Sequence, residues 1–373
     1  MQPIKKFNGL DHLRALAIVL VFIYHYRMFE HPSWIDTVGW IGWTGVDLFF
    51  VISGFLISNQ LFREVKEKHP IDLKTFYIKR FFRIIPPYLF TLFLYFCIPV
   101  FREREALPSI WKFITFTQNY GLDVIQKGTF SHAWSLCIEE QFYLMLPAIL
   151  LLFYKTKSIR YLTFGIIFLI LVSIFMRYFS WNEYIVPTIG HSDFWKDWYM
   201  KIYYPTYTRF EGLSIGVLAG YFFQFSKKFK LFIDKNGNIL LLSGLLSAAF
   251  SLYFCRDQYS EGASIWGFSF VAASYGILLL GAISTSSFVN KRKSFLTSKI
   301  ALLSYSVYLS HKGVVHLVHL LLDRFNISLP DTFIFFICLA ACFFTGILYL
   351  YCIEKPSSYL KIKILNIISH EKI

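Results

Sequence analysis

The sequence predicts an all-α integral membrane protein of about ten transmembrane helices with both termini in the cytoplasm. Three observations carry this prediction. The 373 residues are 56% hydrophobic and only 16% charged, and their mean hydropathy is +0.51. Apolar runs long enough to cross a bilayer recur along the chain. Positive charge is concentrated in alternate connecting segments. A composition this apolar argues against a soluble globular enzyme.

The predicted spans form one domain over residues 1–373 and leave a short basic tail at 354–373. They lie at 10–30, 42–62, 84–101, 135–154, 161–178, 206–226, 238–255, 264–287, 300–322 and 332–353. With the N-terminus inside, internal segments hold 25 of the 37 Lys and Arg residues and external segments hold nine. This asymmetry follows the positive-inside rule. The net charge of +14 therefore reflects topology, and nucleic acid is not an expected partner.

The first span carries two residues that are costly inside a membrane, Arg14 and His25. Their spacing of eleven residues places them on one helix face, about 16 Å apart along the axis. A surface ion pair between Asp11 and Arg14 is the structural alternative for the arginine. Snorkelling to the cytoplasmic side does not explain His25, which lies much deeper in the span.

The second and third spans add an acid and a pair of arginines. Asp47 lies just below the predicted external surface, where a carboxylate needs a partner or water. Arg80 and Arg83 share a helix face. They suit either ordinary positive-inside charge or a guanidinium pair that binds phosphate, and the sequence leaves both readings open. Gly45 and Gly54 allow close helix packing in the second span.

The fourth span begins with a polar face. Ser135, Glu139 and Tyr143 follow one another at intervals of four residues, so they project from the same side of a helix. Glu140 points about 100° away from that side. We interpret Glu139 as a carboxylate of a functional site, because an acid inside an apolar helix is hard to explain as a lipid-facing residue.

Three polar residues of later spans complete the candidate site. Arg209 and Glu211 lie just below the external surface in the sixth span, and His311 lies near the middle of the ninth. The histidines of the ninth span lack the spacing of a strong ligand set, so no metal is expected. His311 is assigned a packing or hydrogen-bonding role. The aromatic-rich external segment 179–205 suits either an interfacial belt or a cover over a sugar-binding entrance.

Sorted by depth, these residues form two layers. The inner, cationic layer contains Arg14, Arg80 and Arg83 and suits a nucleotide. The outer layer suits proton transfer, and its members are His25, Asp47, Ser135, Glu139, Arg209 and Glu211. The layers are about three helical turns apart, which is comparable to the length of a pantetheine arm. A coenzyme A thioester held at the inner layer would place its acyl carbon at the outer one.

These residues together resemble the acyltransferase-3 family of integral membrane acyltransferases. The resemblance rests on Arg14 followed after ten residues by His25, on GVDLFFVISGFLI at 45–57, on RFFR at 80–83, and on Ser135, Glu139, Phe142 and Tyr143. SYSVYLSH at 304–311 and IEKP at 353–356 resemble the closing helices of the family. The resemblance covers nearly the whole chain and is most specific before residue 145.

The resemblance implies an enzyme that takes an acyl group, usually acetyl, from cytoplasmic acyl-CoA. The acceptor it implies is a hydroxyl of an extracytoplasmic glycan or lipid-linked sugar. By matching positions, it implies that His25 is catalytic and that Arg14, Arg80 and Arg83 bind the donor. Glu139 belongs to its fourth-helix motif, with a catalytic or structural role. It also implies the stand-alone form, without a fused extracytoplasmic hydrolase-like domain, in a bacterial cytoplasmic membrane.

The sequence therefore predicts a membrane O-acyltransferase with acetyl as the expected group. Neutral His25 would remove the proton of the acceptor hydroxyl, with Glu139 or Asp47 orienting the imidazole. A covalent acyl-histidine step stays open. The expected supporting residues are Ser135, Tyr143, Arg209, Glu211 and His311. The alternative is a proton-coupled transporter or exporter of a glycan intermediate, because buried histidines and acids also suit proton coupling.

Overall fold

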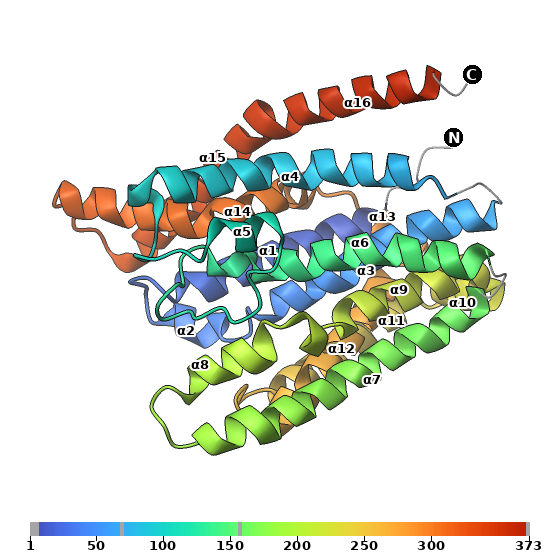
Figure 1. The fold of residues 1–373 in the computed structure, drawn as a ribbon, viewed down its shortest axis with the longest axis horizontal. Helices are drawn as coiled ribbons and strands as arrows, with labels where there is room; N and C mark the ends of the chain where they lie inside the picture. Colours follow the sequence, from blue (N-terminus) through green and yellow to red (C-terminus); the bar gives the residue numbers. More distant parts are fainter. Residues whose placement is uncertain (1–6, 68–70, 156–158, 371–373) are drawn as a thin grey trace.

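The computed structural model describes residues 7–67, 71–155 and 159–370, and this part of the chain is helical without a strand. Long helices run side by side in one bundle (Figure 1). They are α1 (Asn8–Tyr26), α3 (Thr44–Lys66), α4 (Leu73–Cys97), α6 (Trp134–Lys155), α7 (Leu162–Ser180), α9 (Glu211–Phe225), α11 (Gly237–Phe254), α12 (Phe268–Ile283), α14 (Phe295–Arg324) and α15 (Asp331–Tyr349). Each predicted span overlaps one of these helices, which confirms the all-α prediction.

Seven stretches of the described chain are long and apolar enough to cross a membrane, so the multi-pass prediction is confirmed. The predicted spans outside those seven correspond to α4, α9 and α14. α9 has only 15 residues, while α4 carries the arginine pair and α14 carries His311 and Lys312. The count of ten spans and the cytoplasmic location of the termini stay predictions.

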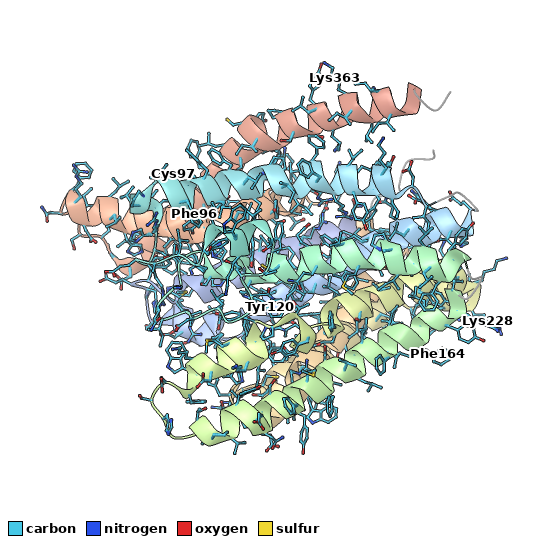
Figure 2. All side chains as sticks on the ribbon, viewed as in Figure 1. Phe96, Cys97, Tyr120, Phe164, Lys228 and Lys363 are labelled. Carbon is cyan, nitrogen blue, oxygen red and sulfur yellow. The ribbon has the colours of Figure 1, made fainter. Side chains whose placement is uncertain are left out.

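Short helices mark the two ends of the bundle. α2 (Trp34–Gly39), α5 (Ile110–Ile114) and α8 (Phe194–Trp198) lie at one end, which topology predicts to be external. α10 (Lys227–Lys235), α13 (Phe288–Lys291) and the last turns of α16 (Lys355–His370) lie at the other end (Figure 1). Side chains of this second end include the exposed Lys228 (Figure 2), as expected of a basic cytoplasmic face.

Small residues let the backbones of α1 and α9 approach α3 closely. A Cβ added at Gly54 of α3 would collide with the carbonyl group of Leu213 in α9. A Cβ at Gly45 would lie 2.6 Å from the carbonyl oxygen of Ala17 in α1. The glycines predicted to serve packing therefore do so. They fix the start of α3 against the helix that carries Arg14 and His25.

α4 begins at Leu73, well before the predicted span. Asp72 caps it by accepting a hydrogen bond from the Thr75 backbone N–H at 3.0 Å. Pro86 and Pro87 lie inside this helix rather than at its start. One helix therefore carries the arginine pair from the basic end of the bundle into its interior.

Candidate active site

Two cavities lie along α1, and the first contains the arginines. This inner cavity encloses about 840 Å³ of space between protein atoms, including its open mouth. Arg14 enters it from α1, and Arg80 and Arg83 enter it from α4. The apolar part of its wall includes Phe49, Phe50, Ile52, Leu56, Ile84 and Leu136. Three guanidinium groups beside an apolar wall suit a ligand with phosphates at one end and a hydrocarbon arm at the other.

Glu139 also lines the inner cavity. Tyr143 donates a hydrogen bond to its Oε2 at 2.8 Å, and Ser53 donates one to its Oε1 at 3.3 Å. The Arg80 guanidinium lies 5.2 Å from the ring centroid of Tyr143. Glu140 lines the same cavity, although its helical position predicted otherwise. The cavity wall wraps around α6, so side chains about 100° apart both reach it.

This placement differs from the predicted grouping of the polar residues by depth. Ser135 and Glu139 were expected beside His25, but they share a cavity with the arginines. Depth along a helix fixes how far a residue lies from the membrane surface. It does not fix which neighbouring helices the side chain faces. Two residues at a similar depth can therefore face different helices and line different cavities.

The second cavity, the outer cavity, lies towards the end of the bundle that carries α2 and α8. It encloses about 1,230 Å³, and His25 and His132 line it. Its aromatic walls are formed by Tyr24, Trp43, Trp134, Trp195, Tyr199, Tyr203, Tyr204 and Tyr259. Four of these residues belong to the segment 179–205, so that segment covers a cavity as well as contributing aromatic surface. A large aromatic cavity with some polar groups suits a bulky polar ligand.

Polar contacts hold segments 102–134 and 179–205 around the outer cavity. Lys196 of α8 lies 3.0 Å from Asp123 of segment 102–134. Burial raises the pKa of Asp123, but the hydrogen bond from Lys196 and those from the backbone N–H groups of Gln126 and Ile125 together outweigh it, so this pKa lies below its ordinary value. Asn119 donates hydrogen bonds to the Tyr204 carbonyl oxygen at 3.1 Å and to the Thr206 hydroxyl at 2.8 Å. Two segments far apart in the sequence therefore form one wall.

His25 has a defined hydrogen-bond partner, His311 of α14. The distance from His25 Nδ1 to His311 Nε2 is 2.9 Å. His311 Nδ1 faces the backbone carbonyl oxygens of Tyr308 at 2.8 Å and Val307 at 3.2 Å, so it carries a hydrogen. In neutral His311, Nε2 is then the acceptor, and His25 Nδ1–H donates to it. This tautomer leaves His25 Nε2 with a free lone pair on a side chain that lines the outer cavity.

His132 is a neighbour that the sequence reasoning missed. Its ring centroid lies 4.7 Å from that of His311 and 5.7 Å from that of His25. Its Nε2 lies 3.3 Å from the Leu309 carbonyl oxygen. Its position in the sequence could have pointed to it, because His132 lies three residues before Ser135, at the start of the predicted polar face. Over the ranges that the structure describes, no group of His, Cys, Asp or Glu side chains has the arrangement of a metal site.

Ser135 and Tyr308 lie where the two cavities approach each other. The Tyr308 hydroxyl donates to the His132 carbonyl oxygen, so Ser135 Oγ donates to Tyr308, at 2.6 Å. Ser135 and Tyr308 line the inner cavity, whereas His132 lines the outer one. Val46 lines both. The wall between the cavities therefore contains Val46 and the hydrogen-bonded Tyr308.

Asp47 and Arg209 form a buried ion pair. Asp47 Oδ1 lies 2.7 Å from Arg209 Nη2, and each side chain is at most 1% exposed. The Arg209 guanidinium lies 4.1 Å from the Phe268 ring centroid and 4.7 Å from that of Tyr203. Neither ion belongs to the described lining of the two cavities. The partner that orients the His25 ring is His311 rather than Asp47 or Glu139.

Glu211 has a similar buried partner. Its Oε1 lies 2.7 Å from Arg177 Nη1. Arg177 also donates to the carbonyl oxygens of Thr208 at 2.6 Å and Ile265 at 2.9 Å. Because these contacts satisfy the Arg177 guanidinium and join α7 to the neighbouring segments, Glu211 belongs to the scaffold around the site.

We expect Asp47→Ala to destabilise the fold. The change leaves the Arg209 guanidinium buried and unpaired, which costs about 3–5 kcal/mol. Thermal unfolding of the detergent-solubilised protein should show a clear drop in Tm. Arg27→Ala is the control, because the Arg27–Asp36 pair is partly exposed and such pairs contribute at most about 1 kcal/mol. A wild-type Tm in Asp47→Ala would show that the ion pair does not stabilise the fold.

Comparisons with known proteins identify the family of the chain. The model of the acyltransferase domain family matches residues 7–352. Peptidoglycan O-acetyltransferase OatA of Listeria monocytogenes is 30% identical over 371 residues, which cover 94% of this chain and 56% of that protein. O-acetyltransferase OatA of Staphylococcus aureus is 28% identical over 338 residues, which cover 83% of this chain and 51% of that protein. The chain thus spans about half the length of the curated relatives it matches. No solved structure matches it.

Proposed function

The chain belongs to the acyltransferase-3 family, and from that premise we propose that it is a membrane O-acetyltransferase. It takes acetyl from cytoplasmic acetyl-CoA and transfers it to a hydroxyl of an extracytoplasmic glycan or lipid-linked sugar. It works in the bacterial cytoplasmic membrane. One observation carries the proposal: an arginine-lined cavity and a cavity containing His25 follow one another along α1, and Val46 lines both. The name of the peptidoglycan O-acetyltransferase relative supports a glycan acceptor.

The inner cavity is the donor site of this proposal. Arg14, Arg80 and Arg83 bind the phosphates of acetyl-CoA, since guanidinium groups match phosphate oxygens in charge and geometry. The pantetheine arm then follows the apolar wall towards Val46. Arg14 and His25 are about 16 Å apart along the α1 axis, a length that this arm can span. Glu139 and Tyr143 hold Arg80 in the cavity and offset part of the positive charge.

His25 is the general base of the transfer. Its Nε2 takes the proton from the acceptor hydroxyl while the hydroxyl oxygen attacks the thioester carbonyl carbon. The tetrahedral intermediate collapses, the carbon–sulfur bond breaks, and the departing thiolate takes the proton from His25 Nε2. The products are the O-acetyl ester and free coenzyme A, so no proton is left over.

His311 positions the base in this reaction. Its Nε2 accepts the hydrogen bond from His25 Nδ1–H, so the reacting lone pair stays on Nε2. When His25 becomes an imidazolium, both of its nitrogens donate, and the bond to His311 stays in place. The outer cavity, with its aromatic walls, binds the acceptor beside His25.

Inverted membrane vesicles test the proposal. They expose the cytoplasmic face of the protein to added acetyl-CoA and enclose the native glycan. With acetyl-CoA labelled in the acetyl group, vesicles that contain the protein should acquire alkali-labile label on the enclosed glycan, and vesicles without it should not. Label that stays in solution, together with glycan that still reaches the lumen, would favour the transporter or exporter instead. Mass spectrometry of the glycan distinguishes these results.

A further inference from the structure

Val46 lines both cavities, and its neighbours in the chain hold it in place. Val46 is the third residue of α3 and is 5% exposed. The glycine before it, Gly45, packs against Ala17 and Val21 of α1. The residue after it, Asp47, is held by the ion pair with Arg209 at 2.7 Å. Its backbone therefore has little room to move away from the boundary between the two cavities.

Tyr308, which also lines the inner cavity, is held as firmly. The Tyr308 hydroxyl has two hydrogen bonds, one from Ser135 at 2.6 Å and one to the His132 carbonyl oxygen. The Tyr308 ring contacts the ring of Phe49, one turn beyond Val46 on α3, with 6.5 Å between the centroids. Val46 and Tyr308 both line the inner cavity, so with both residues held in place the space beside Val46 depends on the volume of its side chain.

We propose that Val46 sets the length of the acyl group that the enzyme transfers. This inference rests on the proposed function, in which the thioester carbonyl must reach His25 from the inner cavity. The acyl chain lies in front of that carbonyl and has to fit past Val46. The valine side chain at this boundary admits acetyl and disfavours each added methylene, and one methylene in a tight apolar site changes kcat/KM by about 10–200-fold.

A competition between two donors tests the inference. Inverted vesicles receive equimolar acetyl-CoA and propionyl-CoA, and mass spectrometry gives the ratio of propionyl to acetyl esters on the glycan. This ratio does not depend on how much protein is present. Val46→Ala should raise it about tenfold or more, and Val46→Ile should lower it while acetyl transfer continues. Val51→Ala is the matched control, because Val51 is a buried valine of α3 outside the described lining of both cavities.

The outcomes separate this inference from the proposed function. If wild-type vesicles transfer neither group, the proposed function fails. If the wild type transfers acetyl but the two Val46 variants keep its ratio, only the role of Val46 fails. Loss of acetyl transfer in a folded Val46→Ala protein, where the space beside residue 46 is larger, also overturns it. Should Val46→Ala not fold, the ratio in Val46→Ile decides.

Discussion

His25→Ala is expected to reduce acetyl transfer by about 10³-fold, because a positioned general base contributes about 10²–10⁴-fold. The variant should remain folded, since the change removes one imidazole beside a large cavity. Initial rates of labelled ester formation in inverted vesicles measure the effect, with the amount of protein normalised on blots. His191→Ala is the control, because His191 is an exposed histidine of segment 179–205. Wild-type rates in His25→Ala would remove the base from the mechanism.

The hydrogen bond from His25 to His311 leads to a second prediction, about the residue that positions the base. In His311→Gln, the side-chain oxygen can still accept the hydrogen of His25 Nδ1, so a substantial part of the rate should remain. His311→Leu offers no acceptor, so His25 is free to change tautomer and rotate, and kcat should fall with little change in KM for acetyl-CoA. Equal rates in these two variants would show that His311 only fills space.

Replacing Arg80 and Arg83 together with alanine is expected to raise KM for acetyl-CoA by about 100-fold, because charge-assisted hydrogen bonds contribute about 1.5–3 kcal/mol each. The effect should depend on the phosphates of the donor. Wild-type protein should prefer acetyl-CoA to S-acetylpantetheine, which lacks the nucleotide, and the double variant should lose most of that preference. Initial rates over a range of donor concentrations give both quantities.

The matched control for the arginines is the double variant Lys227→Ala with Lys228→Ala. These residues begin α10 at the same basic end of the bundle, and both are exposed. They carry the same charge without lining the inner cavity. If the two double variants weaken donor binding equally, general surface charge explains the effect. If neither changes KM, the arginines are topology charges and the donor site lies elsewhere.

The pairing of residues across the site could be predicted only in part. Arg80 and Arg83 could be placed with Arg14, because topology puts all three at one depth. The partner of His25 could not be predicted, since His311 lies 286 residues further along the chain. Asp47 and Glu139 were reasonable candidates for that role by depth. In the fold, Asp47 pairs with Arg209, and Glu139 faces the arginines.

The sequence by itself determined the class of the protein and the contents of its first helix. Apolar runs, loop charge and glycine spacing are local properties, and the bilayer acts on each segment separately. These features can therefore be recognised from the sequence alone. Only the tertiary structure decided which polar side chains share a cavity, that His311 is the hydrogen-bond partner of His25, and that Val46 lines both cavities. These depend on how the faces of distant helices turn towards one another, and that is set by packing across the whole bundle.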